Sequence, residues 1–91
     1  MRQILSKLET AILSSIDTGN NRRSVKAEVI SETGCSIKEV DQAIKKMRVL
    51  GLLRYEEQGT YLVANFAQHH GKGILYDRAL DVYTYESEKD S

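Results

Sequence analysis

Residues 32–63 read ETGCSIKEVDQAIKKMRVLGLLRYEEQGTYLV, and this stretch decides the fold. Gly34 permits the positive φ of a tight turn, and Ser36 followed by Glu39 is the capping-box signature of a helix N-terminus. The stretch from Ser36 to Gly51 has apolar residues at helical spacing and predicts a helix over residues 36–50. The apolar residues that recur there at helical spacing are Ile37, Val40, Ile44, Met47 and Leu50.

Two short runs rich in β-forming residues follow this helix. They are Leu52 to Tyr55 and Thr60 to Val63, and Glu56-Glu57-Gln58-Gly59 joins them. Gly59 suits the left-handed position of a hairpin loop, so the pattern predicts a two-stranded β-hairpin.

Two further helices are expected upstream. Between Arg2 and Asp17 the apolar residues follow one helix face, and the run DTGNN at 17–21 ends that helix. Ser24 can cap a second, shorter helix that stops at Thr33-Gly34. The apolar residues on these two helices are Ile4, Leu5, Leu8, Ala11, Ile12 and Ile16, then Val25, Val29 and Ile30.

The secondary structure of the C-terminal part is left open by its sequence. Residues 68–73 predict a loop, and residues 74–85 suit a helix with one apolar side. Tyr83-Thr84-Tyr85 suits a strand equally well. We therefore expect a domain over 1–66 and a C-terminal extension over 67–91, helical or extended, with a disordered acidic end.

The ordered set of motifs over residues 24–63 resembles the winged helix-turn-helix of small transcriptional regulators of the MarR, ArsR and PadR type. The residues that carry the resemblance are Gly34, Ser36, Val40, Ile44, Lys45-Lys46, Met47, Gly51-Leu52 and Gly59-Thr60-Tyr61. The resemblance implies a mostly helical α+β fold of three helices and a two-stranded wing. It extends to residues 1–23 by helix placement and does not cover the tail.

This resemblance implies that helix 36–50 lies in the major groove of double-stranded DNA. Gln42 suits bidentate contact with adenine and Lys38 contact with guanine, whereas Glu39 and Asp41 depart from the family pattern. The acidic wing tip at 56–57 is a further departure, since carboxylates are repelled by phosphate. The predicted DNA-binding residues are Arg22, Arg23, Ser24, Lys26, Ser36, Lys38, Gln42, Lys45, Lys46, Arg54 and Thr60.

Composition excludes several classes of protein. Ninety-one residues, 41% hydrophobic and 29% charged, fit one ordinary globular domain without room for a two-lobed enzyme. No apolar run is long enough to span a membrane, and the N-terminus lacks the apolar core of a signal peptide. A single cysteine cannot form an internal disulfide, so we expect a cytoplasmic protein. The absence of a catalytic triad or phosphate loop predicts no enzymatic activity, no cofactor and no small-molecule ligand.

Cys35, His69 and His70 lack the paired spacing of zinc ligands. We therefore expect no bound metal, with Cys35 packed before the start of helix 36–50.

The net charge of zero hides a division along the chain. Residues 1–54 hold ten Lys and Arg against six acids, and residues 55–91 hold three against seven. This division favours a sequence-specific DNA-binding regulator over the alternative, a winged-helix module that binds other proteins. Tyrosines in the tail, and Leu13 outside the main apolar stripe of its helix, predict a homodimer.

Overall fold

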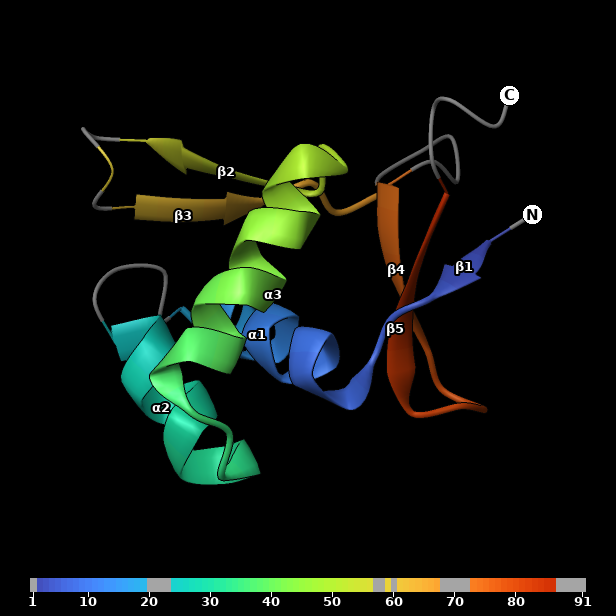
Figure 1. Cartoon of the computed structure of the whole chain (residues 1–91). Helices are drawn as coiled ribbons and strands as arrows, with labels where there is room; N and C mark the ends of the chain where they lie inside the picture. The colour runs from blue at the N-terminus through green and yellow to red at the C-terminus, as the bar shows by residue number, and fades with distance from the viewer. Residues whose placement is uncertain (1, 20–23, 57–58, 60, 68–72, 87–91) are drawn as a thin grey trace.

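The computed structural model describes residues 2–19, 24–56, 59, 61–67 and 73–86. These residues form three helices and two antiparallel sheets, in an α+β domain (Figure 1). One sheet is the predicted hairpin, and the other has the strand order β1-β5-β4. The helices are α1 (Lys7–Asp17), α2 (Ser24–Thr33) and α3 (Ile37–Val49), and the strands are β1 (Gln3–Ile4), β2 (Leu53–Glu56), β3 (Tyr61–Ala64), β4 (Gly73–Asp77) and β5 (Val82–Glu86).

The helix and hairpin predicted over 36–63 are confirmed as α3, β2 and β3. Gly34, Gly51 and Gly59 all have the positive φ that their turns require, between 72° and 84°. The predicted inward face of α3 is correct at its centre and wrong at its ends. Val40, Ile44 and Met47 are buried, whereas Ile37 and Leu50 are 60% and 38% exposed.

The predicted start of the first helix at Arg2 is wrong. Ser6 caps α1, because its side-chain oxygen accepts from the Glu9 amide at 3.1 Å and its own amide donates to Glu9 Oε1 at 2.9 Å. Gln3 and Ile4 instead pair with β5, opposite Tyr85 and Thr84. Ile4, which periodicity placed on the buried helix face, is 65% exposed.

The C-terminal part of the chain forms strands, not the helix that was the other alternative. β4 and β5 pair over their full lengths, with Tyr76 opposite Tyr83. The turn between them is held by Asp77, whose Oδ1 accepts from the amides of Ala79 and Leu80 at 3.0 and 3.1 Å. Ile74 and Tyr83 are buried in the same core as the helices. Residues 87–91, expected to be disordered, lie outside the described residues.

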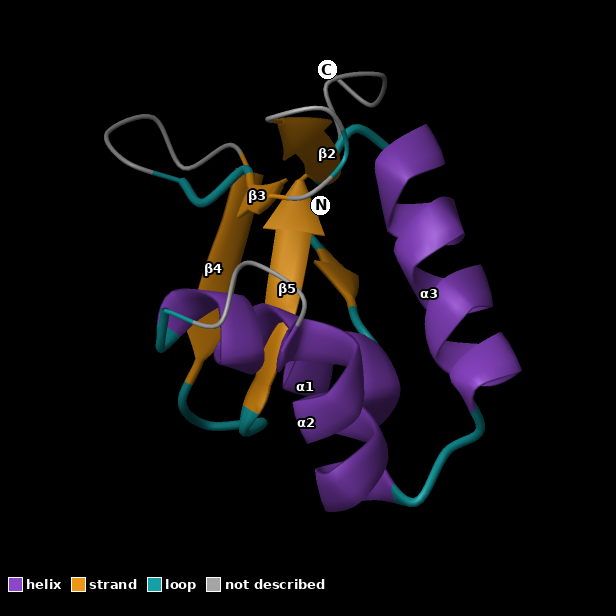
Figure 2. Ribbon diagram, turned by 90° about the vertical axis from the view of Figure 1, so that its left-hand side faces the viewer, coloured by secondary structure: helices purple, strands orange, loops and turns teal. Residues whose placement is uncertain are grey.

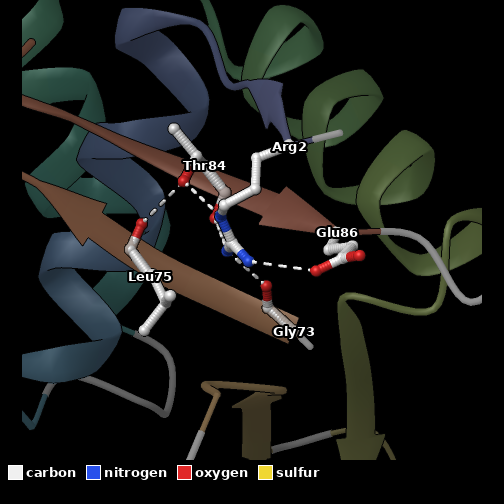
Figure 3. A network of polar contacts seen from close by, with 5 residues as sticks. All are labelled: Arg2, Gly73, Leu75, Thr84 and Glu86. Atoms are coloured by element: carbon white, nitrogen blue, oxygen red, sulfur yellow. Dashed lines mark hydrogen bonds and ion pairs between the residues drawn. The ribbon is translucent and has the colours of Figure 1, made fainter. Parts of the chain in front are cut away.

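A network around Arg2 fastens the N-terminal strand to this sheet (Figure 3). Its guanidinium donates to Thr84 Oγ1 at 2.9 Å, to the Thr84 carbonyl at 3.0 Å and to the Gly73 carbonyl at 2.7 Å. Arg2 Nη1 also lies 3.8 Å from Glu86 Oε2. One side chain therefore joins β1 to both β4 and β5.

A single hydrophobic core lies between the helices and both sheets. Leu13, predicted to lie on an exposed face available to a second subunit, is fully buried in this core, so that prediction is wrong. α1 contacts both α3 and β5, and Figure 2 shows α3 standing apart from the β4–β5 hairpin. No helix in the described part of the chain is long and apolar enough to cross a membrane.

Candidate nucleic-acid interface

The outward face of α3 carries a row of exposed side chains. Lys38, Gln42, Lys45 and Val49 are spaced by four, three and four residues, which places them on one helix face, and all four are exposed. The buried residues of α3 lie on the opposite face. The predicted base-contacting residues Lys38 and Gln42 therefore lie side by side near the N-terminal half of the helix, with Lys45 one turn further on.

The capping box of α3 occupies Glu39, one of the two acids that depart from the family pattern. Glu39 Oε1 accepts from the Ser36 amide at 3.0 Å, and the Glu39 amide donates to Ser36 Oγ at 3.2 Å. The backbone hydrogen bond from Ser36, followed by the side-chain one, holds the pKa of Glu39 below its usual value. The carboxylate stays ionised at the helix N-terminus, where the helix dipole favours it.

The second acid, Asp41, forms an ion pair with Lys26 of α2. The Lys26 Nζ lies 2.6 Å from Asp41 Oδ1, and the two side chains are 41% and 50% exposed. The hydrogen bond to Asp41 raises the pKa of Lys26, although desolvation opposes the shift. Lys26 was predicted to contact phosphate, and here its charge is shared with a carboxylate of the neighbouring helix.

Lys46 also has an acidic partner. Its Nζ lies 3.6 Å from Glu9 Oε2, on α1, and the Lys46 side chain remains 66% exposed while that of Glu9 is 6% exposed. A carboxylate this deeply buried needs a nearby cation, because burial penalises an isolated charge. Lys46 therefore has a structural role in addition to its predicted place among the phosphate contacts.

The hairpin next to α3 carries two further cation contacts. Arg54 on β2 donates from Nε to Glu56 Oε1 at 3.0 Å, so one acid of the hairpin is neutralised on its own strand. Arg48, which was not among the predicted contacts, lies with its guanidinium carbon 4.7 Å from the centre of the Tyr55 ring. Its position in the last turn of a helix followed by an aromatic strand residue is the signal that could have identified it.

Several predicted residues lie outside the described residues, namely Arg22, Arg23 and Thr60, and so do Glu57, His69 and His70. Ser24 is the first residue of α2. Cys35 is half-buried and packs against the core. Within the described ranges, no group of three or more His, Cys, Asp or Glu could hold a metal ion.

Comparison of the chain with protein-family models, with curated proteins and with solved structures found no match.

Proposed function

We propose that this protein is a winged-helix transcriptional regulator, located in the cytoplasm, that binds double-stranded DNA with α3 in the major groove. The observation that carries the proposal is the exposed row formed by Lys38, Gln42 and Lys45. The two acids that would face phosphate on the same helix both have local partners, Ser36 for Glu39 and Lys26 for Asp41.

The length and position of α3 suit this role. A helix of 13 residues is about 20 Å long, and the major groove admits a helix of this diameter. Gln42 offers an amide that both donates to and accepts from adenine, and Lys38 donates to guanine. Lys45 and Lys46, further along, suit phosphate oxygens, which fix the register without reading sequence.

A homodimer is part of the proposal. Two recognition helices related by a twofold axis would read half-sites about 34 Å apart, one turn of DNA. Ile4 of β1 and Leu75 of β4 both lie opposite Thr84 of β5, are 65% and 41% exposed, and supply apolar surface for a second subunit. Sedimentation of the intact chain on its DNA decides this part, since one subunit per site would refute the dimer without affecting DNA binding.

A protein-interaction module is the second candidate function. The pairing of Lys26, Lys46 and Arg54 with carboxylates favours it, because each pair reduces the charge available to phosphate. The two candidates differ in DNA affinity. The module predicts a Kd no better than about 10⁻⁴ M at physiological salt, the weak end of non-specific binding.

Fluorescence anisotropy on duplexes from the upstream region of the protein's own gene tests the proposal. Gln42→Ala is expected to cost about 1–3 kcal/mol on the preferred site and to relax base preference. Lys45→Ala is expected to weaken binding to all duplexes and to lower the salt slope by about one. Lys7→Gln, an exposed cation on α1 away from the row, is the matched control and is expected to change neither. Binding at the weak non-specific level, unaffected by Gln42→Ala, would replace the DNA-binding proposal with the module.

A further inference from the structure

An open groove of about 640 Å³ lies between α1 and the β4–β5 hairpin. Its floor on α1 is made of small side chains, Thr10, Ala11 and Ser14, spaced on one helix face. Glu9, on a different face of α1, pairs with Lys46 of α3. The groove is therefore separated from the outward face of α3 by the body of α1.

One wall of the groove is apolar and exposed. Leu80 and Tyr76 are 52% and 46% exposed, large values for side chains of this size at the rim of a concave surface. The Tyr76 ring stands edge-on to the ring of Tyr83, with 5.2 Å between their centres, so the two rings fix each other's orientation. This wall offers aliphatic and aromatic surface to a bound chain.

The charge lining the groove is negative. Asp17, Glu32 and Asp81 contribute carboxylates, and Lys7 is the one cation among the described lining residues. In the described part of the chain, neither Asp17 nor Glu32 has an ion-pair partner, while Asp81 accepts a hydrogen bond from the Tyr76 hydroxyl. Asp17 and Tyr83 both line the groove, and burial, followed by the Asp17 carboxylate, raises the pKa of Tyr83.

Carboxylates beside apolar and aromatic surface suit a side chain with an aliphatic stem and a cationic end. Arginine and lysine bury their stems on apolar surface and keep the charge near acids, and a guanidinium also stacks on tyrosine. The α1 side of the groove runs from Lys7 to Asp17, about 15 Å at 1.5 Å per residue. An extended peptide covers that length with about five residues.

We propose that this groove docks an extended basic segment of a partner protein, about five residues long and carrying arginine or lysine. The segment would lie along α1, with its cations at Asp17, Glu32 and Asp81 and its apolar residues against Leu80 and Tyr76. Duplex DNA would be repelled by the same carboxylates, so the groove and the α3 face take different ligands. Because α1 separates them, both can be occupied together, and the inference does not depend on DNA binding.

The test is a titration of the ¹⁵N-labelled full chain with the peptide acetyl-Ala-Arg-Leu-Arg-Ala-amide, followed by amide chemical shifts. We expect saturable shifts at Thr10, Ala11, Ser14 and residues 80–83. A matched peptide with citrulline in place of each arginine keeps the shape without the charge, and is expected to bind at least tenfold more weakly. Asp17→Asn and Glu32→Gln are each expected to weaken binding of the arginine peptide about two- to fivefold, the usual range for exposed ion pairs.

Glu56→Gln, which removes the same charge from the wing, is the control and should leave peptide binding unchanged. The proposal is overturned by the absence of saturable shifts at millimolar peptide, by equal binding of the citrulline peptide, or by shifts confined to α3. Shifts of the groove residues that grow with protein concentration alone would also overturn it, since a second copy of the chain would then be the occupant. Asp17→Asn and Glu32→Gln should keep the DNA affinity of the unmodified chain, so failure of the groove and failure of DNA binding are distinguishable.

Discussion

Replacing Asp41 by asparagine is expected to strengthen DNA binding while slightly weakening the fold. Asp41 holds Lys26 at 2.6 Å, and both side chains are about half exposed. Exposed pairs contribute about 0.2–1 kcal/mol, and screening by water places this one within that range. Asp41→Asn should therefore lower the free energy of unfolding by less than about 1 kcal/mol, as measured by urea denaturation.

The gain in DNA affinity follows from the charge that the substitution releases. Without its carboxylate partner, Lys26 becomes available to one more phosphate, and one contact steepens the slope of log K against log salt by about 0.9. Over the fourfold range from about 50 to 200 mM salt, that slope corresponds to an affinity ratio of about 3.5. The ratio of the DNA affinity of Asp41→Asn to that of the unmodified chain should thus be about 3.5 times larger at the lower salt than at the higher.

Fluorescence anisotropy with one duplex across this salt range measures the effect. Glu32→Gln is the matched control, because it changes the net charge equally at a residue of α2 that lines the groove beside α1. Its slope should equal that of the unmodified chain. If Asp41→Asn binds with an unchanged slope, Lys26 does not face the phosphates and its predicted place among the DNA contacts is incorrect.

Three further predictions concern stability. Gly73→Ala should lower the free energy of unfolding in urea by about 2–5 kcal/mol, because Gly73 has φ 92° and an added Cβ would lie 2.7 Å from the Asn65 carbonyl oxygen. Gly59→Ala, which has open space around it, should lower it by only about 1–2 kcal/mol, the cost of backbone strain. Equal losses for the two variants would refute the close approach at Gly73. Because the pKa of Glu39 is lowered in the folded state, the unmodified chain should be more stable than Glu39→Gln above pH 4.5, and this difference in the free energy of unfolding should vanish as the pH falls through the folded pKa. A stability difference that persists at pH 2 would contradict the capping geometry. Leu13→Ala should lower the free energy of unfolding by about 2–5 kcal/mol, because it leaves a cavity in the core. Calorimetry that shows no loss of stability would contradict the burial of Leu13.

The parts of the fold that the sequence predicts are those whose signals are local. The turn at Gly34, the cap at Ser36 and the end at Gly51 all act within one helical turn of their position, so α3 is predicted to within a residue at each end. The hairpin that follows is specified by residues that are neighbours along the chain. The residues of α3 that do not belong to its predicted apolar face also include the exposed row.

The parts that could not be predicted depend on contacts between distant residues. Ile4 and Leu5 continue the apolar period of α1, but Ile4 pairs with Thr84, eighty residues away, and the helix begins only after Ser6. The Ser6-x-x-Glu9 signature was present and would have identified this start. Leu13 is buried because the core surrounds α1 on more sides than one apolar stripe indicates.

The pairing of charges across the fold limits what charge counting can predict about function. Lys26 with Asp41 and Lys46 with Glu9 each join two helices, and Arg2 is committed to the β1-β5-β4 sheet. These contacts depend on how the helices and strands pack, and a count of charged residues along the sequence does not show which of them pair. The excess of cations in residues 1–54 therefore overstates the charge presented to DNA, and it is the exposed row on α3 that should determine both affinity and salt dependence. Specificity should then rest more on Gln42 than on the total charge, since a single well-placed amide discriminates bases while each paired lysine contributes little to binding.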